Sequence, residues 1–213
     1  MGTASNEAPL VARLDDARRA VYREHILDVA EAEFGRCGFS AAKVGDIATR
    51  AGISLATLYK TFASKADLWD ALNTDRMEEF TRVVTERTSA IASPLERLLV
   101  GARAEVEFFA ARDAFLQLHL RDGLSWGTAS TFPGAGQGAQ RVAWRTGMAM
   151  TAATAQEAID AGELRQVRSE VAAAIVISSL QIWLTDWIAT GRSRPIDQVA
   201  DDVEEHLRRS LAV

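Results

Sequence analysis

All the lysines of this 213-residue chain lie in one short segment. Lys43, Lys60 and Lys65 are the only lysines, in a chain whose formal net charge is −5. From Arg36 to Lys65 there are five basic residues and one acidic residue, so the remainder of the chain is strongly acidic. A local excess of ammonium and guanidinium groups in an acidic protein suits binding to a polyanion, above all to the phosphates of a nucleic acid.

A pattern of small, glycine and apolar residues, Ala48-x3-Gly52-x5-Leu58, lies inside the same segment. Where two short helices cross around a tight turn, the first helix needs a small residue and the turn needs a residue that tolerates positive φ. The second helix needs an apolar residue that faces the crossing. Ile47 and Ile53 complete a small core. The spacing predicts a helix-turn-helix unit, and the alternative is a solvated basic face on an ordinary helical hairpin.

The N-terminal half of the second helix is the part that meets base edges in the major groove. Hydroxyl groups can bond to bases or phosphates there, and an aliphatic side chain can touch a thymine methyl. The next helix offers free N–H donors after Ser64, so Lys65 and these amides are predicted to meet a phosphate together. The predicted DNA-binding residues are Lys43, Val44, Ser54, Leu55, Thr57, Tyr59, Lys60 and Lys65.

The stretch "GFSAAKVGDIATRAGISLATLYKTFASKADLWDAL", Gly38 to Leu72, resembles the DNA-binding region of the tetracycline-repressor (TetR) family of bacterial transcriptional regulators. The likeness rests on "GFS", "DIATRAGIS", "TLYKTF" and "SKADL", and it extends back to about Ile26. It implies that Tyr59 contacts DNA, that Lys65 meets phosphate, and that the rest of the chain binds a ligand and dimerises. Two residues depart from the family pattern: Lys43 replaces a common threonine, and Thr61 replaces an aromatic residue or histidine.

The elements that position this unit are predicted to be helices throughout. Proline is scarce, at four residues, and no convincing strand alternation occurs, which indicates an all-α fold. Three parts are expected: a flexible arm at 1–17, the helix-turn-helix domain at 18–66, and a helical ligand-binding and dimerisation domain at 67–213. Ser54, Ser64 and Ser93 are predicted helix caps. A glycine-rich loop is expected at 122–138, between helices at about 113–121 and 139–161, with later helices at about 170–189 and 195–211.

Aromatic and methionine side chains gather in the middle of the larger part. With few polar groups among them, such side chains suit an apolar or aromatic small ligand, although plain core packing is the alternative. The predicted effector-binding residues are Phe108, Phe109, Phe115, His119, Trp126, Phe132, Trp144 and Met148.

The segment 170–189 is apolar nearly all round, so it needs cover on both sides. Self-association would provide that cover, with the last helix alongside in a four-helix contact across a two-fold axis. A central helix buried inside a monomer is the alternative. The predicted dimerisation residues are Val171, Ile175, Leu180, Trp183, Trp187, Val203 and Leu207.

Other functional classes find little support in the sequence. It contains no G-x-S-x-G, P-loop, G-x-G-x-x-G after a strand or H-E-x-x-H pattern, so neither an enzyme nor a cofactor is expected. His25, His119 and His206 are far apart and predict no metal site. No apolar run is long enough to span a membrane, and the lone Cys37 fits a buried thiol in a reducing compartment such as the cytoplasm.

These observations predict a ligand-responsive regulator of transcription. The expected protein is a repressor that binds a palindromic operator in double-stranded DNA as a homodimer and is released by a small apolar or aromatic effector. The alternative is a helical small-molecule-binding protein or enzyme whose DNA-binding unit is non-functional.

Overall fold

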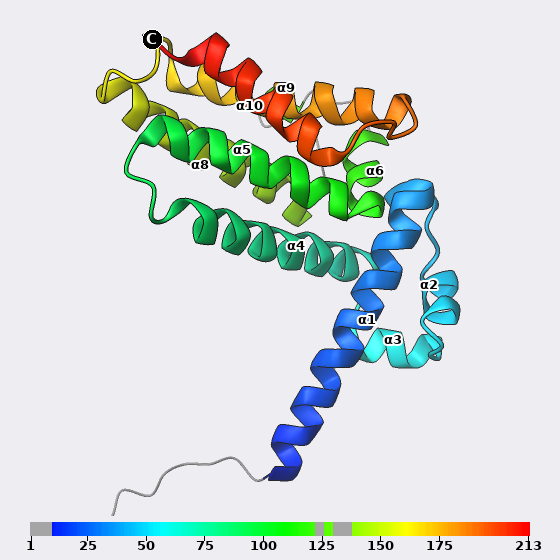
Figure 1. Cartoon of the computed structure of the whole chain (residues 1–213). Coiled ribbons are helices and arrows are strands. Elements are labelled where there is room, and N and C mark those ends of the chain that lie inside the picture. Colours follow the sequence, from blue (N-terminus) through cyan, green and yellow to red (C-terminus); the bar gives the residue numbers. More distant parts are fainter. Residues whose placement is uncertain (1–9, 122–125, 130–137) are drawn as a thin grey trace, which may run out of the picture.

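The computed structural model of the chain describes residues 10–121, 126–129 and 138–213, and within these ranges every regular element is a helix (Figure 1). The all-α class is therefore confirmed. The helices are α1 (Leu10–Ala41), α2 (Val44–Arg50), α3 (Leu55–Thr61), α4 (Lys65–Thr88), α5 (Pro94–Ala111), α6 (Asp113–Arg121), α7 (Trp126–Ala129), α8 (Gly138–Asp160), α9 (Ser169–Ala189) and α10 (Ile196–Leu211).

Three helices begin at the serines that the sequence indicates. The Ser54 Oγ accepts a hydrogen bond from the Thr57 amide at the start of α3. Ser64 accepts from the Asp67 amide at the start of α4, and Ser93 accepts from the Glu96 amide at the start of α5. Each serine satisfies an amide that would otherwise lack a partner in the first turn of its helix. The predicted caps are confirmed.

Two predicted irregular segments contain helix. Helix α1 begins at Leu10, so residues 10–17 are helical and the flexible-arm prediction is wrong for them; residues 1–9 lie outside the described part. Residues 16–25 are exposed, so this part of α1 has no buried stripe that the sequence could reveal. Likewise α7 lies inside the predicted loop 122–138, most of which is also outside the described residues.

An N-terminal unit forms from α1 after residue 25, α2, α3 and the first turns of α4. Its core includes Phe34, Ile47 and Leu58, all fully buried. Trp69 of α4 joins this core, with its ring centroid 5.1 Å from that of Phe34 and 5.0 Å from that of Phe39. The first turns of α4 thus pack with the N-terminal unit. The predicted domain boundary after residue 66 stays a prediction.

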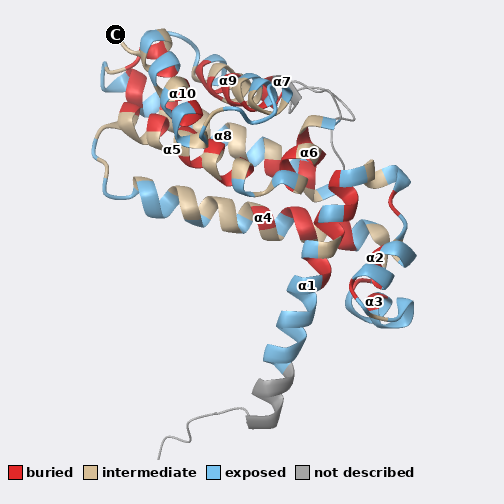
Figure 2. Cartoon of the chain, turned by 45° about the vertical axis from the view of Figure 1, so that its right-hand side comes forward, coloured by how far each residue is buried: buried red, intermediate tan, exposed pale blue. Residues whose placement is uncertain are grey.

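The remaining helices form a helical body around α5, which packs against α4, α8 and α10 (Figures 1 and 2). Helix α9 is long and apolar enough to cross a membrane by length and composition, with a mean hydropathy of 1.6 over its best window. In this fold α9 packs against α8, α10 and α7. One side of α9 is therefore covered by neighbouring helices, as in the core helix of a globular domain.

The N-terminal unit and the body meet where α1 crosses α6. A Cβ atom at Gly35 would lie 2.4 Å from the Ala114 carbonyl oxygen, so only glycine allows the two backbones to touch here. The Arg121 guanidinium of α6 donates to the carbonyls of Gly35, at 3.0 Å, and of Arg36, at 2.6 Å. Backbone contact and these two hydrogen bonds fix α1 against the body.

A buried ion pair makes a second connection, between α4 and α1. Arg76 of α4 is 4% exposed. It donates to Glu31 at 2.6 Å, to Asp28 at 2.5 Å and to its neighbour Asp75 at 2.9 Å. Glu31 is also buried. Because a buried guanidinium requires compensating acceptors, the relative position of α4 and α1 depends on these pairs.

Candidate nucleic-acid interface and effector cavity

The turn between α2 and α3 has the geometry that the sequence predicts. Gly52 has a φ of 67°. The Ile53 amide donates to the Ala48 carbonyl at 3.0 Å and the Gly52 amide to the Thr49 carbonyl at 3.1 Å. This pair of bonds is the Schellman motif, in which a glycine in the left-handed region ends a helix. Ala48 and Leu58 are buried at the crossing, so the predicted helix-turn-helix is present.

The outer face of α3 is open to solvent (Figure 2). Leu55 and Tyr59, one turn apart on that face, are each 45% exposed. Thr57 and Lys60 are exposed as well, as is Lys43 just before α2. An apolar residue and a tyrosine left exposed on a short helix are candidates for contact with a partner. These predicted contact residues are therefore accessible to a partner.

Val44 and the two hydroxyl residues of α3 have structural roles of their own. Val44 is partly buried and packs against the core. The Ser54 and Thr57 hydroxyl oxygens lie 2.8 Å apart, in addition to the cap bond. The Thr61 hydroxyl donates to the Thr57 carbonyl at 3.4 Å. Ser54 and Thr57 therefore fix the start of α3, and any contact with DNA would use exposed hydroxyls already held in place.

Lys65 differs most from its predicted role. Its Nζ donates to the carbonyls of Phe39 at 2.9 Å, Ser40 at 3.3 Å and Ala42 at 3.1 Å, and it lies 4.6 Å from the centroid of the Phe39 ring. Carbonyls at a helix end lack partners within the helix and attract a cation. An ammonium has three N–H donors, and all three are occupied. The Lys65 amine therefore already has partners within the chain, and its contact with phosphate stays a prediction.

Two of the five basic residues of the segment share one carboxylate within the chain. Arg36 lies 2.6 Å and Arg50 lies 3.2 Å from the carboxylate of Glu33, which is buried. The hydrogen bond from Arg36 lowers the pKa of Glu33 despite burial, and the charges of both arginines act in the same direction. Among the described residues Lys43 and Lys60 have no ion pair. They are the cations that remain for a phosphate.

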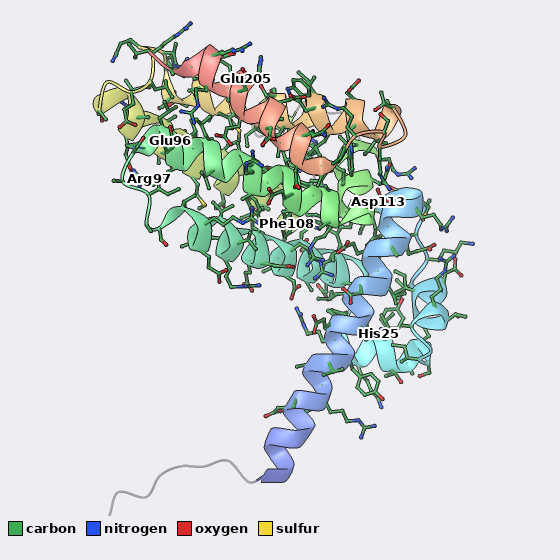
Figure 3. The ribbon with its side chains drawn as sticks, viewed as in Figure 1. His25, Glu96, Arg97, Phe108, Asp113 and Glu205 are labelled. Carbon is green, nitrogen blue, oxygen red and sulfur yellow. The ribbon has the colours of Figure 1, made fainter. Side chains whose placement is uncertain are left out.

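The body encloses a cavity of about 230 Å³. It is bounded by side chains from α4, α5, α6, α7, α8 and α9, and Figure 3 shows Phe108 between α5 and α4. Phe132 lies outside the described residues. The cavity collects the other predicted effector-binding residues: Phe108, Phe109, Phe115, His119, Trp126, Trp144 and Met148.

Aromatic rings form a continuous wall on one side of this cavity. The rings of Phe109 and Phe115 stack with centroids 5.8 Å apart, and Trp126 lies 5.0 Å from Phe109. His119 lies 4.3 Å from Phe115 and 6.1 Å from Trp144. Because each ring contacts another, the wall is preformed rather than assembled by a ligand.

Two groups that line the cavity have strongly shifted pKa values. The His119 Nδ1 lies 2.8 Å from the Phe115 carbonyl, and burial lowers the pKa of His119 to about 4, so the ring is neutral near pH 7. Burial raises the pKa of Glu105 to about 7. Three charged residues of the cavity wall, Glu105, Arg76 and Arg97, were not predicted from the sequence. The available signal for Glu105 was its position three and four residues before Phe108 and Phe109, on the same helix face.

The predicted dimerisation residues separate into two groups. Leu180, Val203 and Leu207 are fully buried inside the chain, so these three assignments are wrong: they hold α9 and α10 to the core. Val171 is exposed, and the structure adds Ile182, which is 66% exposed. Three further predicted dimerisation residues are partly buried: Ile175, Trp183 and Trp187.

Trp183 and Trp187 are held by the segment that joins α9 to α10. The Trp187 Nε1 donates to the Arg194 carbonyl at 2.9 Å, and the Arg194 guanidinium lies 5.9 Å from the Trp183 ring centroid.

Within the described residues no group of three or more His, Cys, Asp or Glu side chains could hold a metal ion.

The family comparison matches the N-terminal unit. The family model "Bacterial regulatory proteins, tetR family" matches residues 26–72, which span α1 from Ile26 to the middle of α4. Together with the observed helix-turn-helix, this match identifies residues 26–72 as a TetR-family DNA-binding domain. The resemblance in the sequence is therefore confirmed. No curated protein matches the chain.

Solved structures share the fold over nearly the whole chain. The ketosteroid transcriptional regulator KstR2 of Mycobacterium tuberculosis is 22% identical, with a TM-score of 0.70 over 90% of this chain and 95% of that one. The fatty acid degradation regulator FadR from Bacillus halodurans is 17% identical, with a TM-score of 0.71 over 87% and 93%. A transcriptional regulator from Saccharomonospora viridis in complex with choline is 18% identical, with a TM-score of 0.71 over 91% and 99%. At these identities the likeness shows the fold.

Proposed function

We propose that the protein is a ligand-responsive repressor that binds a palindromic operator as a homodimer. The observation that supports this most directly is the exposed α3 face, presented by a Schellman turn at Gly52 inside a TetR-family domain. Leu55 and Tyr59 would meet base edges or sugar, since a helix of this kind enters the major groove. Lys43 and Lys60 would meet phosphates on either side.

The dimer would form through the outer face of α9. Its exposed Val171 and Ile182 leave apolar surface uncovered by the described chain. A second copy on the same face would bury it in an isologous contact, in which the same patch serves both subunits. Two α3 helices about 34–36 Å apart would then read successive major grooves.

The cavity would hold the effector. Proteins with the same fold include a fatty acid degradation regulator, a ketosteroid transcriptional regulator and a regulator in complex with choline. The fold therefore does not determine the ligand, and the residues that line the cavity must do so. Here the lining is mostly aromatic and aliphatic, which suits a small molecule with an apolar body.

Helix α4 would carry the response from the cavity to the DNA. Met77 and Phe80 line the cavity, while Arg76, on the same helix, pairs with α1. A ligand changes such an equilibrium only through unequal affinity for the two conformations. Full switching requires a difference of about 5.5 kcal/mol between them. A shift of α4 around the ligand would reorient α1 and the α3 face.

The decisive experiment is titration of labelled double-stranded DNA from the region upstream of the protein's own gene, followed by fluorescence anisotropy. We expect tight binding that a scrambled duplex does not compete, and a marked loss of affinity for Tyr59→Ala, whose side chain is exposed. Equal binding to specific and scrambled duplexes, or no binding, would contradict the proposal. The latter result would favour a ligand-binding protein with a non-functional DNA-binding unit.

A further inference from the structure

The cavity contains one acidic group without a partner. Glu105 lies on α5 and lines the cavity, with Phe108 and Phe109 three and four residues further along the same helix face. Among the described residues no hydrogen bond or ion pair to its carboxylate is present. Burial is the sole cause of its raised pKa, which agrees with the absence of a neighbouring charge.

The other charged or titratable groups of the lining are already compensated or neutral. On α4, Arg76 is bound by three carboxylates. On α5, Arg97 pairs with Glu157 of α8, and its place eight residues before Glu105 puts it about 12 Å away along the helix. On α6, His119 is neutral near pH 7. The lining residues from α7, α8 and α9 carry no charge.

We propose that the effector is an organic cation, whose ammonium group lies between the Glu105 carboxylate and the aromatic rings of the cavity wall. This inference rests on the proposed effector cavity and narrows its ligand. A partly buried carboxylate without a partner is unfavourable in its ionised form, and a neutral hydrocarbon in the cavity would leave it without a partner. A cation would pair with it directly.

The aromatic wall supports the same ligand class. Faces of Phe and Trp rings attract an ammonium within about 6 Å of the ring centroid. Phe108 and Phe109 lie on the side of α5 that carries Glu105, and Trp126 lies beside Phe109. Thus the acid and the rings occupy neighbouring positions in one wall. The rest of the ligand would be the apolar body that the cavity already suits.

The test compares a matched pair of probes, benzyltrimethylammonium and its neutral carbon isostere neopentylbenzene. Binding is followed by the fluorescence of Trp126 and Trp144, which line the cavity. For the unmodified protein we expect the cation to bind at least about tenfold more tightly than the isostere. Glu105→Gln should remove this preference and leave the affinity for neopentylbenzene unchanged or higher.

Glu107→Gln is the control variant. Glu107 lies on the same helix but pairs with Arg87 and Arg103 and does not line the cavity. It should keep the preference for the cation. The same titrations across pH give a second measurement: because benzyltrimethylammonium has a fixed charge, its affinity should rise from pH 5.5 to pH 8 as Glu105 ionises around pH 7. Glu105→Gln should show no such rise.

Two results would overturn the inference: no binding of the cation to the unmodified protein, or unchanged preference for it in Glu105→Gln. Operator binding is measured separately on the same samples. Protein that binds DNA but prefers neopentylbenzene contradicts the cation inference alone. Protein that prefers the cation through Glu105 but ignores DNA supports the inference about the cavity and contradicts the proposed repressor function.

Discussion

Glu105 makes stability depend on pH in a direction that is unusual for an acid. Its pKa is about 7 in the folded chain, against an ordinary value of 4.5 for a glutamate in water. The folded state therefore holds this proton more tightly than the unfolded state does. The stability associated with Glu105 is fully present below pH 4.5 and is lost as pH rises through 7.

Glu105→Gln should consequently stabilise the protein at pH 8 by about 2 kcal/mol and leave it nearly unchanged at pH 4.5. Urea denaturation at a fixed protein concentration would measure the difference. Glu107→Gln, which removes an ion pair outside the cavity, should not show this pH trend. Equal effects of Glu105→Gln at both pH values would contradict the buried, unpaired carboxylate.

The three lysines should have separable roles in DNA binding. Lys43→Ala and Lys60→Ala should each reduce the slope of log affinity against log salt by about 0.9, because each removes one phosphate contact. Lys65→Met should leave that slope unchanged and lower the free energy of unfolding by about 2 kcal/mol, because three carbonyls lose a charged donor. Salt titrations and thermal unfolding measure the two effects. A flatter slope with unchanged stability in Lys65→Met would restore its phosphate role.

At the scale of elements, the Arg76 ion pairs connect α4 to α1. Arg76→Met would leave Glu31 buried without its cation, at a cost of about 3–5 kcal/mol. Adding Glu31→Gln should recover part of this loss, since the buried carboxylate is then removed and the remaining partners, Asp28 and Asp75, are more exposed. Urea unfolding of the two single variants and the double variant measures the coupling between the residues. Additive losses would contradict the direct pairing.

The double variant also tests how the effector acts. It should retain operator binding but respond more weakly to a cavity ligand, because α4 no longer holds α1 through a charge pair. Anisotropy titrations with and without benzyltrimethylammonium would show the difference. An undiminished response would place the connection elsewhere, with the contact between α6 and α1 as the remaining route.

The elements that the sequence predicted correctly are those set by neighbouring residues. Capping serines and the glycine turn are local, so Ser54, Ser64, Ser93 and Gly52 could be predicted from the sequence. The aromatic lining was also predictable, because large apolar residues on several helices converge in one core. The start of α1 was missed because its exposed turns carry no apolar stripe.

The sequence could not show features that depend on tertiary contacts. Lys60 and Lys65 are lysines of the same basic segment, but only Lys65 lies beside the end of α1 and donates to its carbonyls. Similarly, α9 is apolar on every side, so the sequence could not show that Leu180 faces inward and Ile182 outward. Glu105 was missed because an isolated acid in a helix is usually solvated.

At the scale of the whole molecule, Ile182 offers a test of the dimer. Its side chain is 66% exposed, so Ile182→Glu should cost the subunit little stability. In a dimer that uses this face, two new carboxylates would meet across the axis, and the protein should become monomeric and lose operator affinity. Val142→Glu on α8, where valine is 64% exposed, is the matched control and should remain dimeric. Analytical ultracentrifugation gives the answer, and an intact Ile182→Glu dimer would place the interface elsewhere.

The touching backbones at Gly35 and Ala114 contain no side chain that could change rotamer to absorb movement. A displacement of α6 would therefore pass to α1 with little loss, and a displacement of α1 would pass back equally well. Linkage requires that operator and effector weaken each other by the same factor. A cell that carries many operator copies would then need a higher effector concentration to fill the same cavities. The number of operator copies would therefore set the effector concentration at which the regulator leaves DNA.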